Sequence, residues 1–279
     1  MKIEDEKIKS ANYLCNEENL EIIDTKFAEG SVSSLENTNN ISLTDCEIDD
    51  ANILVKSKNV TLKDVNVTEY GLNVLEEASF INISNTIISG DNALVKSENV
   101  IIIDSTLNTQ GVCADASSIN ITNTKIISEK AFNGSTNLVF NRVSFAGKYA
   151  FQNTSNVELK DSVFKSQEAF QNASKVVLTD CLIEGDNFGW YTENMTLIRC
   201  HIRGSRPLCY AKKLKLIDCT MAETDGSFEQ SDVEASIKGN IKSVINPLSG
   251  FIEADSYGDI VCDYGKYQIK AIIKTRNKE

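Results

Sequence analysis

The chain has 279 residues, of which 41% are hydrophobic and 24% are charged, and its formal net charge is -12. This composition excludes a disordered chain and suffices for one or two packed cores. The acidic excess is spread along the length, and no basic patch with interleaved aromatic residues is present. Nucleic acid and anionic membrane surfaces are therefore not expected as partners.

The first residues carry no recognisable targeting signal. Residues 1–10 read MKIEDEKIKS and lack the apolar stretch of a signal peptide. No run of the sequence approaches the ~18 apolar residues of a membrane-spanning helix. We therefore expect a cytoplasmic protein.

A repeat begins at Asn19. Its motif is Asn-apolar-x-apolar-x-Asp/Asn-small-x-apolar, as in NLEIIDTKF from Asn19 and NISLTDCEI from Asn40. The sixth position recurs at intervals of 21, 19 and 21, and then at seven successive intervals of 19. A short and strict period is typical of a solenoid, in which neighbouring repeats stack to bury their apolar faces. The sixth positions are Asp24, Asp45, Asp64, Asn85, Asp104, Asn123, Arg142, Asp161, Asp180, Arg199 and Asp218.

Side-chain parity within a repeat predicts β-structure. In the repeat from Asn156, apolar Val157 and Leu159 alternate with charged residues, and the chain must bend at Asp161 because Phe164 has the opposite parity. A third short segment follows at residues 169–170. We expect three short strands and three bends per rung, in an all-β, single-stranded right-handed parallel β-helix of roughly eleven rungs of about 19 residues.

Three other solenoids fit less well. Leucine-rich repeats have a longer period than this sequence and need room for a convex helix. A left-handed hexapeptide helix would show a six-residue period, which is absent from this sequence. An ice-binding helix would need a regular threonine array, but the outward positions hold Lys63, Ser84, Ile103, Thr122, Asn141 and Lys160 in turn.

Equivalent positions of successive rungs predict ladders in the interior. One ladder is expected at Leu159, Leu178, Leu197 and Leu216, a second at Phe132, Phe151 and Phe170, and a third at Phe145, Phe164, Ile183, Ile202 and Met221. The leading asparagines recur at a corner, where asparagine tolerates a left-handed conformation. An asparagine ladder is therefore expected at Asn19, Asn40, Asn59, Asn99, Asn137, Asn156 and Asn194.

Four of the eight cysteines follow the bend, where other rungs carry Thr, Val or Ser: Cys46, Cys181, Cys200 and Cys219. We expect buried, reduced thiols there, since a cytoplasmic compartment disfavours disulfides. No Cys-x-x-Cys pair is present, and the only histidine, His201, has outward parity. Neither a metal nor another cofactor is expected, and a histidine-dependent nucleophile is improbable.

The carboxylates of the bend column have two interpretations. Asp161 and Asp180 lie on adjacent rungs, about 5 Å apart, which is a spacing that a retaining glycosidase could use. The column continues with Arg199 and Asp218, however, so that charges of opposite sign alternate. Alternation of this kind relieves electrostatic repulsion, which favours a structural role.

The third face of the later rungs is the candidate functional surface. Trp190, Tyr191 and Tyr210 replace the amide side chains of the preceding rungs, and Tyr191 is expected to stack on Tyr210. These aromatic residues could bind a carbohydrate or a protein partner, or the irregular C-terminal segment could cover them. The remaining candidate residues of this surface are Glu168, Asp186, Arg203, Arg206 and His201.

The repeat pattern decays from Asp232 onward, although apolar residues still alternate. We expect one β-helix domain over residues 1–279, with regular rungs over 19–231 and irregular rungs and a cap over 232–279. Residues 264–279 form a basic tail that could cap the end of the helix.

Several segments of the second half together resemble one protein family. They are NMTLIRC from Asn194, KLKLIDC from Lys213, residues 188–190, 207–210 and 227–229, and SVINPLSGFIEAD from Ser243. The chain resembles the bacterial proteins grouped as domain of unknown function 3737. The resemblance implies a pectin-lyase-like right-handed parallel β-helix and supplies no catalytic residues, since no activity is established for that family.

Two functional hypotheses follow. The first is a non-enzymatic binding or scaffold protein, because the ladders account for nearly every polar residue by structure. The alternative is a carbohydrate-active enzyme, either a polysaccharide lyase or a glycosidase, which depends on analogy of fold alone.

Overall fold

The computed structural model describes residues 1–276, which contain 26 β-strands and no helix. Over these residues no helix is long and apolar enough to cross a membrane. The chain divides into two compact units, residues 1–144 and 145–279, which we describe separately. The expectation of one domain over residues 1–279 stays a prediction, and its last three residues lie outside the described part.

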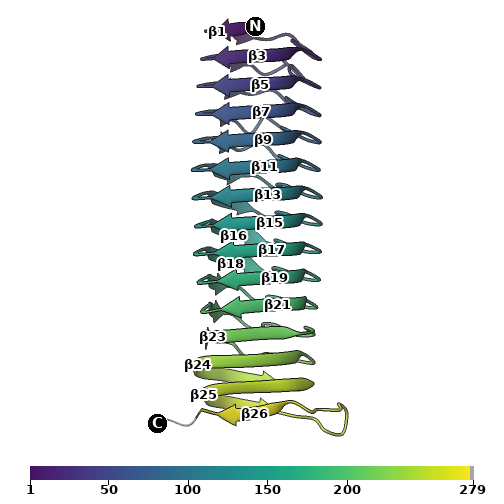
Figure 1. Cartoon of the computed structure of the whole chain (residues 1–279), viewed down its shortest axis with the longest axis vertical. Coiled ribbons are helices and arrows are strands. Elements are labelled where there is room, and N and C mark those ends of the chain that lie inside the picture. Colours follow the sequence, from purple (N-terminus) through teal and green to yellow (C-terminus); the bar gives the residue numbers. More distant parts are fainter. Residues whose placement is uncertain (277–279) are drawn as a thin grey trace. The chain divides into compact units, whose positions relative to one another are not determined.

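The first unit is a parallel β-helix with two strands in each rung. The strands of one side lie above one another in chain order (Figure 1): β1 (Lys2–Glu4), β3 (Glu18–Ile23), β5 (Asn39–Thr44), β7 (Lys58–Lys63), β9 (Ser79–Ser84), β11 (Glu98–Ile103), β13 (Ser117–Thr122) and β15 (Thr136–Asn141). The second side holds shorter strands: β2 (Lys7–Ile8), β4 (Lys26–Phe27), β6 (Glu47–Ile48), β8 (Asn66–Val67), β10 (Ile87–Ile88), β12 (Thr106–Asn108) and β14 (Lys125–Ser128).

The strand register follows the spacing of the sequence repeat. Glu18 pairs with Asn39, and Asn39 pairs with Lys58, so the offsets between partners equal the first two intervals of the repeat. All of these pairings are parallel, and each strand alternates between buried and exposed residues, as β7 does with buried Val60 and Leu62. The predicted parallel β-helix with rungs of about 19 residues is confirmed. The described chain makes about 14 turns, more than the roughly eleven rungs predicted, because strands also form before Asn19 and after Asp232.

The bends lie at the predicted sixth positions. Each of these residues has a left-handed backbone, with φ of 47° at Asp24 and 50° at Asp161. The leading asparagines are also left-handed, with φ of 57° at Asn40, whose Nδ2 donates to Oδ1 of Asn19 at 2.6 Å. Asparagine and aspartate adopt this conformation at low cost, which explains their frequency at the corners. The asparagine ladder over the other leading asparagines stays a prediction, and Phe80, Ser118 and Lys175 interrupt that column.

The third side of each rung differs from the prediction, because it consists of turns and not of a short strand. Glu168, Phe170 and Asn172 alternate with other residues and have φ of 53°, 61° and 58°. A backbone that is left-handed at every second residue cannot form an extended strand. It still bonds between rungs, since the amide of Phe170 donates to the carbonyl of Ala150 at 2.9 Å.

The second unit continues the same design within itself. Its longer strands are β17 (Ser155–Lys160), β19 (Ser174–Thr179), β21 (Glu193–Ile198) and β23 (Leu214–Ala222), and its shorter strands are β16 (Ser144–Lys148), β18 (Val163–Gln167), β20 (Leu182–Glu184) and β22 (His201–Arg203). The predicted ladder of Leu159, Leu178, Leu197 and Leu216 is buried and in register. Two phenylalanine pairs stack inside the unit, Phe145 on Phe164 at 4.5 Å and Phe151 on Phe170 at 4.7 Å between ring centroids.

The C-terminal rungs are longer strands with an altered spacing. β24 (Asp232–Ile245) pairs with β25 (Ser249–Val261), and Asp232 lies opposite Ser249, which is a shorter offset than in the earlier rungs. β26 (Ile272–Thr275), within the basic tail, pairs with residues 251–254 of β25 (Figure 1). The amide of Arg276 then donates to the carbonyl of Ala254 at 2.8 Å. Over its described residues, the tail therefore adds a strand to the last long rung.

Candidate functional site

An aromatic cluster lies on the turn side of the second unit. The rings of Tyr191 and Tyr210 stack, with centroids 4.9 Å apart and an interplanar angle of 12°, which confirms the predicted stack. Trp190 meets both rings edge to face, at 6.2 Å from Tyr191 and 5.6 Å from Tyr210. Tyr191 leaves 50% of its surface exposed, and Trp190 and Tyr210 are half-buried. We refer to Trp190, Tyr191 and Tyr210 as the aromatic cluster.

The repeat positions these rings one above the other. In the preceding rungs the same column holds amides, and Nδ2 of Asn172 donates to Oδ1 of Asn153 at 3.3 Å. Tyr191 and Tyr210 keep the left-handed backbone of that column, with φ of 57° and 60°. The amide of Tyr191 donates to the carbonyl of Cys209 at 3.1 Å, which fixes the two rungs against each other. Along this column the side chains change from stacked amides to stacked rings, while the backbone conformation stays the same.

Arg206 contacts two side chains of the aromatic cluster, those of Trp190 and Tyr210. Nε1 of Trp190 donates to the carbonyl of Arg206 at 2.7 Å, and the guanidinium carbon lies 4.8 Å from the centre of the Trp190 ring. Nη2 of Arg206 donates to Oε2 of Glu229 at 2.8 Å and lies 3.5 Å from the Tyr210 hydroxyl. The hydrogen bond to Glu229 raises the pKa of Arg206, and burial raises the pKa of Tyr210. The ion pair orients Arg206, and the cation–π contact and the indole hydrogen bond restrict the Trp190 ring.

Glu229 is a residue of this site that the sequence reasoning missed. Its carboxylate is the partner of Arg206, and its side chain is only 20% exposed. The signal was present, because Glu229 follows Tyr210 by one period of the repeat, just as Tyr210 follows Tyr191. Extending the column by one period would have placed Glu229 beside the rings.

The other predicted site residues divide into two groups. Asp186 and Glu168 lie on the turn side, where Oδ1 of Asp186 accepts from the amide of Ser205 at 2.8 Å and the amide of Glu168 donates to the carbonyl of Asp186 at 2.9 Å. His201 and Arg203 belong to β22, on the neighbouring side of the rung. Over the described residues no hydrogen bond or ion pair joins these four side chains to the aromatic cluster.

The side chains of β22 have partners on the next rung. Nδ1 of His201 lies 2.5 Å from the Thr220 hydroxyl, and Arg203 makes two hydrogen bonds to the Glu223 carboxylate, at 2.9 and 2.8 Å. Both Arg203 and His201 are exposed. These contacts are cross-strand pairs on the surface of the β-helix, which explains both side chains without a role in binding.

Opposite charges pair between neighbouring rungs of the second unit. Arg199 binds both carboxylate oxygens of Asp180 at 2.7 Å, and Lys165 lies 2.9 Å from Glu184. The hydrogen bond from Arg199 lowers the pKa of Asp180, and that from Lys165 lowers the pKa of Glu184. Carboxylates held ionised in this way are poor general acids at neutral pH. The pattern agrees with the structural interpretation of the bend column.

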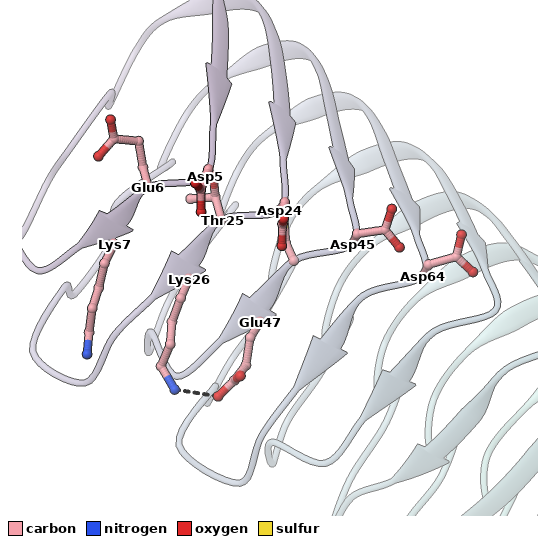
Figure 2. A pocket seen from close by; sticks show the side chains of 10 residues that line it. Asp5, Glu6, Lys7, Asp24, Thr25, Lys26, Asp45, Glu47 and Asp64 are labelled. Atoms are coloured by element: carbon pink, nitrogen blue, oxygen red, sulfur yellow. Dashed lines mark hydrogen bonds and ion pairs between the residues drawn. The ribbon is translucent and has the colours of Figure 1, made fainter.

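A shallow groove of about 460 Å³ in the first unit was not foreseen from the sequence. Figure 2 shows Asp5, Asp24, Asp45 and Asp64 at the bends of successive rungs, with Lys26 and Glu47 paired on the neighbouring strands. Lys26 also lies 3.0 Å from Asp49. Within residues 1–276 no three His, Cys, Asp or Glu side chains are grouped so that they could hold a metal ion. The signal in the sequence was the run of aspartates at the first sixth positions.

The two units are parallel β-helices, and the second of them carries an exposed aromatic cluster held by an ion pair. The chain belongs to the family described as Protein of unknown function (DUF3737), whose model matches residues 1–274. No curated protein matches the chain.

Among solved structures, the chain is similar to PfbA, a surface adhesin of Streptococcus pneumoniae, with 11% identity and a TM-score of 0.33 over 85% of this chain and 70% of the other. It is also similar to the periplasmic alginate epimerase AlgG, with 11% identity and a TM-score of 0.28 over 92% of this chain and 77% of the other. Similarities at this level carry no inference about ligand or activity.

Proposed function

We propose that the protein is a non-enzymatic binding protein and that the aromatic cluster binds a carbohydrate. The observation that carries this proposal is the Tyr191 ring, which ends a two-ring stack and leaves half of its surface exposed. Trp190 and Arg206 already hold the neighbouring groups in place, so a ligand would meet a surface that needs little reordering. Ordered aromatic residues of this kind are typical of binding surfaces.

The chemistry around the rings favours an uncharged sugar. Exposed Asn172 occupies the position of Tyr191 one rung earlier and offers an amide beside the ring. An exposed aromatic ring and a planar amide together suit a pyranose, which has both apolar C–H groups and hydroxyls. Glu229 already neutralises Arg206, the cation in contact with the cluster. Arg206 is therefore not free to pair with an acidic sugar, which would also meet the net charge of -12.

The environment of the carboxylates supports a non-enzymatic role. Glu229 is paired with Arg206, and Asp186 accepts a hydrogen bond from the backbone of Ser205. A glycosidase needs one carboxylic acid whose pKa is raised, beside a second, ionised carboxylate. Glu229, which binds Arg206 beside the cluster, and Asp186, on the same side of the rung, have instead the partners expected of structural groups.

The test is a glycan-binding screen on the purified full chain, followed by calorimetric titration of the glycans that bind. We expect Tyr191→Ala to weaken binding by at least tenfold with little change in melting temperature, because the exposed ring contributes few core contacts. Tyr264→Ala is the matched control, since Tyr264 is 72% exposed and lies outside the cluster, and it should bind like the parent.

Two outcomes would contradict the proposal. Equal glycan affinity in the parent and in Tyr191→Ala, together with a clear loss of stability, would make the cluster a packing surface. Turnover of any bound glycan, measured by release of reducing ends or of unsaturated products, would contradict the non-enzymatic role.

A further inference from the structure

Three cysteines of the second unit form a column inside the β-helix. Cys181, Cys200 and Cys219 each follow a bend residue and are 3%, 1% and 0% exposed. The pairing of Leu182 with His201, and of His201 with Thr220, places them in register on neighbouring rungs. Neighbouring parallel strands lie ~4.8 Å apart, which falls within the Cα separations that a disulfide can span.

The three sulfur atoms also have the same orientation. Sγ of Cys200 lies 3.4 Å from the carbonyl oxygen of Leu178 and 3.5 Å from that of Ile198. Sγ of Cys219 makes the equivalent contacts one rung later, at 3.4 Å to Leu197 and 3.5 Å to Ile217. Cys181 repeats this pattern at 3.7 and 3.3 Å. Identical orientations on adjacent rungs place the three sulfur atoms one above the other, one rung apart.

The central thiol differs from its neighbours because it has a thiol on both sides. Any disulfide between adjacent members of the column therefore includes Cys200.

We propose that this cysteine column is a redox-modification site, in which hydrogen peroxide oxidises Cys200 and a neighbouring cysteine closes a disulfide. The Cys200 sulfur attacks one peroxide oxygen, the O–O bond breaks, and the thiol proton joins the departing hydroxide, which leaves as water. The sulfur of Cys181 or Cys219 then attacks the sulfenic sulfur, the S–S bond forms, and the oxygen leaves as a second water. Two thiols lose two electrons and two hydrogens in total, and one peroxide is reduced to two waters.

Cys46 supplies an internal control for this chemistry. It occupies the equivalent position in the first unit and is 3% exposed, but the neighbouring rungs carry Thr25 and Val65 at that position. An isolated thiol in the same environment has no partner for a disulfide. The column thus differs from Cys46 in one respect, the presence of adjacent thiols.

The experiment exposes the native, fully reduced chain to hydrogen peroxide, blocks the remaining thiols after denaturation and maps the products by mass spectrometry. We expect one disulfide per molecule, with Cys200 in every cross-linked peptide, and a full set of free thiols after a reductant is added. Oxidation of Met1, which is 63% exposed, reports that the peroxide was active in each sample.

Cysteine variants separate this proposal from simple burial. Cys200→Ser should lose the disulfide, and it should fold because Ser162 occupies the same column one rung before Cys181. Cys200→Thr is the second variant, since Thr124 occupies that column in the first unit. Cys181→Ser should still form the disulfide between Cys200 and Cys219, and Cys46→Ser should behave like the parent.

Three results would overturn the proposal. The first is a parent that stays fully reduced while Met1 is oxidised. The second is a disulfide that persists in a folded Cys200→Ser or Cys200→Thr variant. The third is oxidation of Cys200 to a sulfinic acid without any cross-link, which would show that the neighbouring sulfur cannot reach it.

Discussion

Asp50 provides a sharp test of how the first unit is packed. Its side chain is completely buried, and its Oδ1 has no hydrogen-bond partner among the described residues. Oδ2 accepts from the amide of Ser34 at 3.1 Å. Burial raises the pKa of Asp50 to about 6, although hydrogen bonding from Ser34 acts in the opposite direction. We predict that Asp50→Asn stabilises the folded protein at pH 8 relative to the parent.

The sign and size of this effect follow from linkage. The folded state binds the Asp50 proton more tightly than the unfolded state, whose pKa is near 3.8. Stability due to this group is therefore fully present below pH 3.8 and is lost as the pH rises through about 6. The difference between these two pKa values corresponds to about 3 kcal/mol of unfolding free energy. In a unit of this size the change in melting temperature would be about 6 to 12 °C.

The assay is thermal and urea unfolding of the parent and Asp50→Asn between pH 4 and pH 8. The difference between the two proteins should grow with pH across the window from 3.8 to about 6 and then level off. Asp45→Asn makes the same charge change at an exposed bend, where Asn85 and Asn123 are natural occupants in other rungs. A difference for Asp50→Asn that is independent of pH, or equal to that of Asp45→Asn, would refute the reasoning.

Three further predictions concern the second unit. Deleting Glu158 from β17 should reverse the inward and outward parity of the rung and abolish cooperative unfolding, and a variant that melts like the parent would contradict the register. A bulky thiol reagent should label buried Cys181, Cys200 and Cys219 slowly in the native protein and promptly after denaturation, whereas fast native labelling would contradict their burial. Phe151→Ala should lower the unfolding free energy by about 3 to 5 kcal/mol, because this buried ring stacks on Phe170; a loss below about 1 kcal/mol in urea unfolding would contradict that packing.

The repeat made most of the fold predictable from the sequence. Because each rung pairs with the next at a fixed offset, one alignment on Asn19 and Asn40 specifies the strand register, the bends and the inward ladders. The stack of Tyr191 on Tyr210 followed from the same periodicity. Burial of Cys200 followed from parity, since Thr and Val occupy that position in other rungs.

Other features depend on conformation that the apolar pattern does not encode. The third side of the rung was predicted as a strand because Phe170 is apolar and inward, but an inward side chain is equally compatible with alternating left-handed residues. Arg206 and Glu229 lie on different rungs and meet only because the turn brings successive rungs together. The groove beside Asp45 depends on side-chain positions around the bend, which parity alone does not specify.

The central claim is that the aromatic cluster is the binding surface. The measurement that tests it most directly is a titration of the purified chain with the glycans that bind it, in which tryptophan fluorescence is the signal. Trp190 is the only tryptophan of the chain, and it contacts Tyr191, Tyr210 and Arg206. If the aromatic cluster is the binding surface, the emission of Trp190 should change and saturate at the dissociation constant that calorimetry gives, and Tyr191→Ala should shift both together. Calorimetric binding with no change in Trp190 emission would contradict the account.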